Sequence, residues 1–250
     1  MQFTGFFWFV LTLLPLVFLQ RFLHREIQAV ILLITRNVQL TIGLFSVLFF
    51  PGVFLHELSH FLVAKILGVR TRGFSLIPQS LPDGRLQMGY VETEKSDIVR
   101  DSLVGLAPLI AGTLFVAYAG ASKLRLDILW NSLRDGQLEL FWMGLGFLPA
   151  VPDFYVWLYL TFAVSSTMLP SESDRHSWLP LGLWVAALLA LAVFSGAGAW
   201  MIANLAPLLD DLLYSVALLF GLSSLLHVIL LLPFYGIHRL LASLMKVDVR

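Results

Sequence analysis

The five residues HELSH, at positions 56–60 of the 250-residue chain, combine the side chains most able to do chemistry. His56 and His60 are four residues apart, so on a helix they lie one turn apart on one face and can point at a single ion. Glu57 follows the first histidine directly. On a helix, the H-E-x-x-H pattern pairs two zinc ligands with a carboxylate that serves as general base. The spacing therefore predicts a metal-dependent hydrolytic site.

A catalytic zinc ion has three protein ligands and one open position for water. The ion lowers the pKa of that water to about 7, and a carboxylate can then remove its proton. The chain has no cysteine, so the third ligand must be His, Asp or Glu. Residues 37–55, just before the motif, contain no Asp, Glu, Lys or Arg. Ionisable groups in so apolar a stretch mark function by default, and the alternative is a buried trio satisfied by hydrogen bonds alone.

The composition indicates that the lipid bilayer is the partner of most of this surface. The chain is 58% hydrophobic and 13% charged, whereas about 25% charge is usual in soluble domains. Its formal net charge is zero, so no long-range field favours nucleic acid as a partner. We therefore expect an all-α polytopic membrane protein.

Uncharged spans locate the membrane helices, because a crossing needs about 20 apolar residues. They predict about six transmembrane helices, at roughly 2–20, 40–67, 100–120, 152–169, 178–199 and 208–233. The apolar piece 138–149 is too short to cross; it is either re-entrant or the start of the fourth helix, broken at Pro149 and Pro152. The first span lacks a basic leader and a cleavage site, so we expect a retained helix.

Two polar stretches interrupt these spans. Residues 21–37 are mixed and predict an interfacial helix. In residues 68–99, RTRGFSLIP and GRLQMGYVET flank the turn-forming SLPDG, which predicts a small β-hairpin at about 70–92 rather than an irregular loop. The chain would then divide into an N-terminal helix and interfacial segment (1–37), a core with the hairpin insert (38–178) and a C-terminal helix pair (179–250).

Three segments resemble the site-2 protease class of intramembrane zinc metalloproteases, over about residues 40–180. They are HELSH followed by FLVAKILGVRTRGFSL, SLVGLAPLIAG at 102–112, and SSTMLPSESD at 165–174. The resemblance implies that Asp174 joins His56 and His60 in holding one Zn²⁺ per chain. The chain departs from the family where Ser166 replaces an Asn, where Arg175 replaces the Gly after the aspartate, and where Ala107–Pro108 replaces Gly-Pro.

Asp174 also has a structural interpretation. The sequence Ser171-Glu172-Ser173-Asp174 precedes an apolar run and fits a helix capping box. Glu172 and His176 are the nearest substitutes as ligands. Outside this segment, we interpret His227 as a structural or gating histidine, and three further acids as dipole-favoured residues at helix starts: Asp153, Asp210 and Asp211.

Alternation of six helices would place the end of the HELSH helix and Asp174 on one side of the membrane. Ten Lys and Arg residues fall on that side and six on the other, which predicts a cytoplasmic location for the site and both termini, in the plasma membrane.

The combined expectation is an intramembrane zinc metalloprotease that cuts membrane-spanning or membrane-adjacent segments of a protein or peptide substrate, with Glu57 as general base. Two alternatives remain: a non-proteolytic scaffold or regulator with the same fold, and a transporter. Zinc binding alone would not need Glu57, which argues against the scaffold. Few ionisable residues line a path through several helices, which argues against the transporter.

Overall fold

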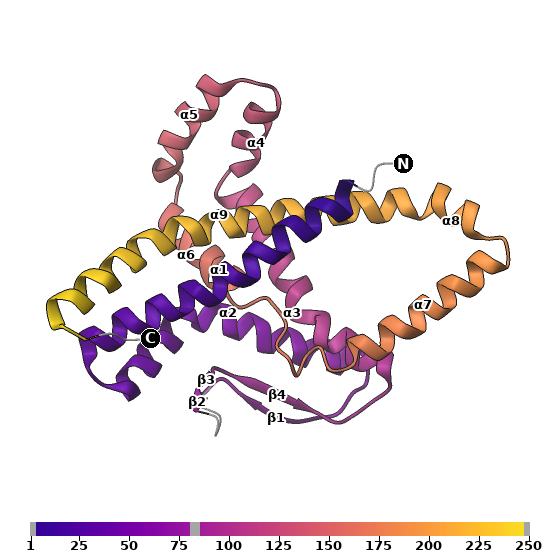
Figure 1. Ribbon diagram of the computed structural model, residues 1–250, viewed down its shortest axis with the longest axis horizontal. Coiled ribbons are helices and arrows are strands. Elements are labelled where there is room, and N and C mark those ends of the chain that lie inside the picture. Colours follow the sequence, from indigo (N-terminus) through magenta and orange to yellow (C-terminus); the bar gives the residue numbers. More distant parts are fainter. Residues whose placement is uncertain (1–3, 81–85, 248–250) are drawn as a thin grey trace.

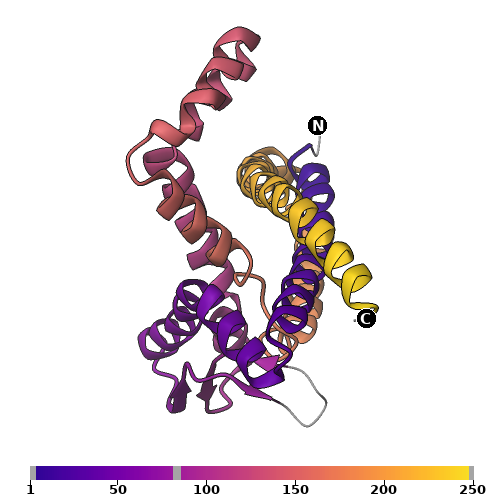
Figure 2. The ribbon, with the colours of Figure 1, turned by 90° about the vertical axis from the view of Figure 1, so that its left-hand side faces the viewer.

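The structure is a computed structural model that describes residues 4–80 and 86–247. Helices make up most of it, and short strands lie on one flank, at the opposite end of the molecule from α4 and α5 (Figures 1 and 2). The helices are α1 (Thr4–Thr35), α2 (Val38–Ile66), α3 (Ile98–Tyr118) with the π-helical η1 (Ala119–Lys123), α4 (Leu126–Arg134), α5 (Leu138–Phe147), the 3₁₀ turn η2 (Leu148–Ala150), α6 (Phe154–Ser165), α7 (Trp178–Phe194), α8 (Gly198–Asn204) and α9 (Ala206–Met245).

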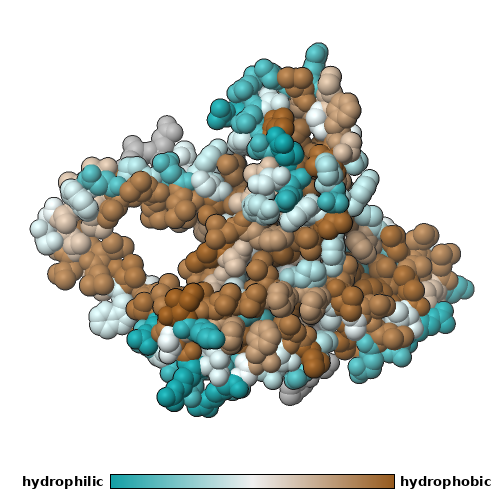
Figure 3. Space-filling model, turned by 180° about the vertical axis from the view of Figure 1, so that it is seen from behind, coloured by the Kyte–Doolittle hydropathy of each residue, from teal (hydrophilic) through white to brown (hydrophobic). Residues whose placement is uncertain are grey.

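Four helices of the described chain are long and apolar enough to cross a membrane: α1, α2, α3 with its extension, and α9. Two bent pairs, α5–α6 and α7–α8, raise the number to six if each pair is one span. Apolar side chains dominate the middle of the face in Figure 3, and hydrophilic ones gather toward its top and bottom. The chain is thus a multi-pass helical membrane protein, as its composition predicts.

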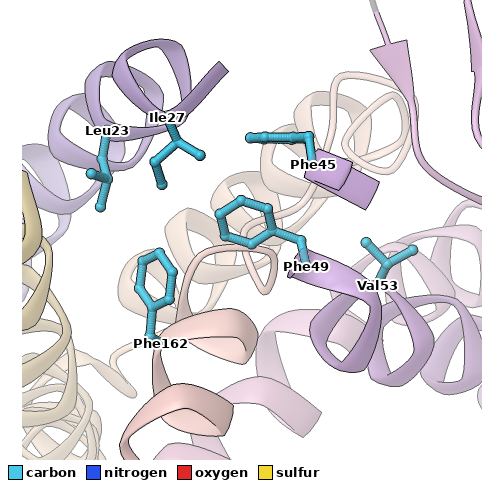
Figure 4. Close-up of a cluster of buried hydrophobic side chains, with 6 residues drawn as sticks. All are labelled: Leu23, Ile27, Phe45, Phe49, Val53 and Phe162. Carbon is cyan, nitrogen blue, oxygen red and sulfur yellow. The ribbon is translucent and has the colours of Figure 1, made fainter. Parts of the chain in front are cut away.

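The expected first span and the mixed segment after it form one unbroken helix, because α1 runs on to Thr35. This half of α1 is apolar toward its neighbours and contributes Leu23 and Ile27 to a buried cluster. Figure 4 shows these two side chains facing aromatic and aliphatic residues of α2 and α6. The remaining cluster members are Phe45, Phe49, Val53 and Phe162. Burial of these side chains fixes α1 against the helix that carries HELSH.

Helices α1 and α9 run side by side in the same direction (Figure 1). At one end, the Gly5 amide donates to the Asp210 carboxylate over 2.9 Å. At the other, His238 donates to Glu26, and both side chains are buried. Asp210 therefore caps the first turn of α1, not its own helix as the sequence predicted, because a Cβ-free Gly5 lets the two backbones touch.

The two bent pairs break at residues of special backbone conformation, proline in one and glycine in the other. Between α5 and α6 the axis turns by 98° in the segment that contains Pro149 and Pro152. Between α7 and α8 it turns by 112°, and Gly196 in the connection has φ +91°, a left-handed conformation that favours glycine. The expected continuous helix 178–199 therefore ends at Phe194.

The strands form two small antiparallel pairs. Strand β1 (Thr71–Ser75) pairs with β4 (Tyr90–Thr93), and β2 (Gln79–Ser80) pairs with β3 (Leu86–Gln87). The predicted SLPDG turn lies largely in residues 81–85, outside the described chain. Leu76 and Met88 pack against the buried cluster that includes Val53, so the strands are docked onto α2 beside the motif.

Candidate metal centre

The two histidines of the motif face each other as their spacing predicts. Both lie on α2, and their Nε2 atoms are 3.2 Å apart. The Nδ1 atom of His56 is 2.7 Å from the Thr167 carbonyl oxygen, and that of His60 is 2.8 Å from the Val104 carbonyl oxygen. A carbonyl can only accept, so each Nδ1 carries the proton. In the neutral rings, both Nε2 lone pairs then point into the same space.

Asp174 lies in the loop between α6 and α7 and closes the trio. Its carboxylate oxygens are 3.2 Å from Nε2 of His60 and 3.6 Å from Nε2 of His56. One ligand atom from each residue can be chosen so that all three lie within 4.8 Å of one another. Burial alone would raise the pKa of the Asp174 carboxyl, but the His56 and His60 rings and the Ser171 amide outweigh it and hold that pKa well below its usual range. The group is therefore a carboxylate.

The two hydrogen bonds of a capping box also form between Ser171 and Asp174, but in a turn before α7. The Ser171 amide donates to the Asp174 carboxylate over 2.7 Å, and the Asp174 amide donates to the Ser171 hydroxyl over 3.3 Å. This reciprocal pair braces the loop before α7 and does not form the first turn of α7, which begins at Trp178. The two interpretations are compatible, because the brace aims the carboxylate at the histidines.

These three residues fit a tetrahedral metal ion. Zinc–ligand bonds of about 2.0–2.1 Å place tetrahedral ligand atoms about 3.3 Å apart. The two Nε2 atoms lie 3.2 Å apart, close to that value, and one Asp174 oxygen lies 3.2 Å from the His60 nitrogen while the other lies 3.6 Å from the His56 nitrogen. With both rings neutral, two imidazole lone pairs and a carboxylate converge here, and a cation relieves their mutual repulsion. The carbonyls of Thr167 and Val104 supply the outer hydrogen bonds that orient metal-binding histidines.

Two glycines let the neighbouring segments approach closely enough to form the trio. A Cβ on Gly52 of α2 would overlap the Ala163 carbonyl and the Thr167 hydroxyl. A Cβ on Gly105 of α3 would overlap the carbonyl oxygen of Asp174. Both positions therefore require glycine for steric reasons, and they bring the partner of His56 and the third ligand into place.

A cavity of about 1000 Å³ opens onto the centre. Its walls come from α1, α2, α3, the strands and the loop after α6. Glu57 lines it and is only 8% exposed. No residue in the described part of the chain donates a hydrogen bond to this carboxylate, so it can accept a proton from a molecule in the cavity.

The sequence interpretation missed polar side chains that α1 brings to this cavity, and it named His227 of α9 without its partners. Gln20 and His24 of α1 line it, and the Gln20 amide donates to the Ser166 carbonyl. His227 of α9, which is fully buried, has its Nε2 2.9 Å from the Ser166 hydroxyl and its Nδ1 2.7 Å from the Ser223 carbonyl. Their positions within apolar helices were the available signal.

The substitute ligands do not join the metal trio. His176 is exposed, with its Nδ1 2.7 Å from the Ser173 carbonyl and its Nε2 3.6 Å from Asp101. Glu172 lines the cavity but is not part of the His56–His60–Asp174 group. Asp153 stands at the start of α6, yet its side chain caps no amide there. Asp211, the residue after Asp210 in α9, is exposed.

Comparison with models of protein families, with curated proteins and with solved structures finds no match for this chain. Its class is therefore defined by its own fold and site. It is a multi-pass helical membrane protein whose HELSH helix and loop before α7 together form a candidate metal centre in an open cavity.

Proposed function

We propose that this chain is an intramembrane zinc metalloprotease similar to site-2 proteases, with His56, His60 and Asp174 as ligands of one Zn²⁺. The observation that carries the proposal is the convergence of two histidine Nε2 atoms and one carboxylate, with one ligand atom from each residue within 4.8 Å of the others. Beside them stands Glu57, a carboxylate with no hydrogen-bond donor in the described chain. A purely structural trio would not require a further carboxylate beside it.

The proposed reaction is hydrolysis of a peptide bond. A bound zinc ion would act as a Lewis acid and lower the pKa of water in the cavity to about 7. Glu57 accepts a proton from the attacking water as its oxygen bonds to the carbonyl carbon. Glu57 then returns that proton to the leaving nitrogen as the C–N bond breaks, which yields a carboxylic acid and an amine. The remaining cavity wall would position the substrate chain.

The position of the cavity among apolar helices and beside the strands supports a membrane segment as the substrate. A membrane-spanning helix hides its carbonyls in its own hydrogen bonds, so a segment must unwind before it can be cut. Residues Tyr90–Thr93 of β4 line the cavity, and an unwound segment could add to these strands as a further strand. The substrate is therefore a membrane-spanning or membrane-adjacent protein segment.

The parallel arrangement of α1 and α9 favours five crossings over six. If both helices cross the membrane in the same direction, an odd number of crossings must lie between them. Helices α2 and α3 and the α5–α6 pair supply three, so the α7–α8 pair returns to the side on which it started. The N- and C-termini then lie on opposite sides.

This topology removes the charge argument for a cytoplasmic site. Arg239, Lys246 and Arg250 move to the far side, and the basic residues number seven on the side of the site and nine on the other. The proposal that the site faces the cytoplasm is therefore supported by the resemblance to site-2 proteases and no longer by the distribution of charge.

The test of the function is Glu57→Gln, which keeps the shape of the side chain but cannot accept the proton. We expect the purified variant to keep one zinc per chain and to lose at least about 100-fold in cleavage of a reconstituted membrane-segment substrate. His56→Ala with His60→Ala should lose the zinc, and chelation should abolish wild-type cleavage. Equal cleavage by wild type and Glu57→Gln would refute the mechanism. Zinc binding without wild-type cleavage of varied membrane segments would favour the scaffold.

A further inference from the structure

Glu57 is held in place by packing. As noted above, no described residue donates a hydrogen bond to its carboxylate. A general base must nevertheless be fixed, because a misplacement of about 1 Å can cost about 100-fold in rate. The walls against which this side chain packs therefore set the geometry of the proposed reaction.

One of these walls is the backbone of Gly89, between β3 and β4. A Cβ built on Gly89 would lie 2.9 Å from Cγ of Glu57, closer than side-chain carbons pack. It would also lie 3.1 Å from the Ser75 carbonyl oxygen and 3.1 Å from Cγ1 of Val53. The glycine thus fills a narrow space between the base, the neighbouring strand and α2.

The strands hold this wall against α2 from both sides. Ser75 pairs with Tyr90 in the register of β1 and β4, immediately beside Gly89. Met88 packs against the cluster that contains Val53, as does Leu76, which directly follows β1. The position of Gly89 is therefore tied to the same helix that carries Glu57.

Of the three groups around Gly89, the side chain of Glu57 is the one that an added Cβ would displace most easily. The Ser75 carbonyl belongs to a paired strand, and Val53 is β-branched, so it has one strongly preferred rotamer on a helix. Glu57 has several rotamers and no hydrogen bond from the described chain to hold any of them. A side chain at position 89 would push the base out of its place before it moved the backbone.

We infer that Gly89 is a positioning residue for Glu57, and that the strand insert thereby sets the orientation of the general base. This inference rests on the proposed function. It assigns to the strands a role in the chemical step, in addition to any contact with substrate.

The test is a double-mutant cycle between Gly89→Ala and Glu57→Gln, with zinc content and thermal unfolding measured on each protein. Gly89→Ala should keep its zinc, leave KM unchanged and lower kcat by about 10- to 100-fold. In the Glu57→Gln background the same change should have no further effect, because the group through which it acts is already lost. Gly73→Ala in β1 is the matched control, since its nearest contact would be the end of the Tyr90 ring at 3.4 Å.

Different outcomes separate this inference from the function beneath it. Equal loss of kcat from Gly89→Ala in both backgrounds, or a raised KM with kcat unchanged, would show that the strands act on substrate and would overturn the inference alone. If Gly89→Ala does not fold, Met88→Ala replaces it in the cycle, because it loosens the docked strands without a clash; an additive loss overturns the inference. A wild type that cleaves nothing overturns both.

Discussion

Substitution of Gly105 by alanine should weaken binding of the proposed zinc ion although no ligand residue is changed. In α3, the Gly105 backbone lies against the Asp174 carbonyl, and a Cβ there would overlap that oxygen. The two nearest atoms, the carbonyl oxygen and carbon of Asp174, belong to the backbone, so the overlap can be relieved only if α3 or the loop moves. The preceding residue, Val104, accepts the hydrogen bond that orients His60. The substitution therefore disturbs a ligand and the support of a second ligand together.

The magnitude follows from the tolerance of the site. Ordinary contact begins at about 3.4 Å, so the overlapping groups must separate by more than about 1 Å, whereas zinc ligands must lie within about 0.2 Å of their ideal distances. Loss of an outer hydrogen bond alone costs about 10- to 100-fold in metal affinity. Displacement of Asp174 should therefore cost at least about 100-fold, on top of about 1–3 kcal/mol of overpacking.

The assay is zinc affinity by competition with a chelator, measured with thermal unfolding on the same samples. Gly43→Ala is the control: it makes the same chemical change in the helix that bears the motif, at a position where a Cβ meets nothing within 4 Å. The control should bind zinc as the wild type does. A folded Gly105→Ala protein with wild-type zinc affinity would refute the reasoning that α3 and the loop position Asp174.

Two further results are expected. Asp174→Asn should keep the brace with Ser171, because Asn caps about as well as Asp, yet weaken zinc binding and abolish cleavage; full activity would transfer the ligand role to Glu172 or His176. Because the chain has no cysteine, single cysteines introduced at the exposed Lys95 and Lys246 can be labelled with an impermeant maleimide in sealed vesicles. The two should label from opposite sides, and labelling from the same side would contradict five crossings.

Local spacing made the histidine pair predictable. The repeat of the helix is a property of the backbone, so two histidines four apart in an apolar helix must share a face whatever surrounds them. The structure places His56 and His60 in that way. The apolar spans were predictable for a similar reason, since the thickness of the bilayer sets the length of apolar sequence that a crossing needs. Asp174 was identified by its resemblance to a motif, and the sequence also left a capping role as the alternative.

The partners of each helix could not be predicted from the sequence. A helix that is apolar all round shows no amphipathic stripe, so nothing in its sequence marks the face that meets a neighbour. The parallel pairing of α1 with α9 and the extension of α1 to Thr35 depend on such contacts. The sharp turn at Gly196 was also missed, because glycine is common within membrane helices and does not by itself end one.

The sequence by itself determined that two histidines and a carboxylate stand on one apolar helix, and that the chain is built for a bilayer. Only the tertiary structure decided what meets them. Asp174 reaches the histidines because Gly52 and Gly105 allow backbones to touch, and Glu57 is confined because Gly89 fills the space beside it. Such contacts depend on the absence of side chains at positions far apart in the chain, and the physical reason is steric: whether a missing Cβ matters is decided by what lies opposite.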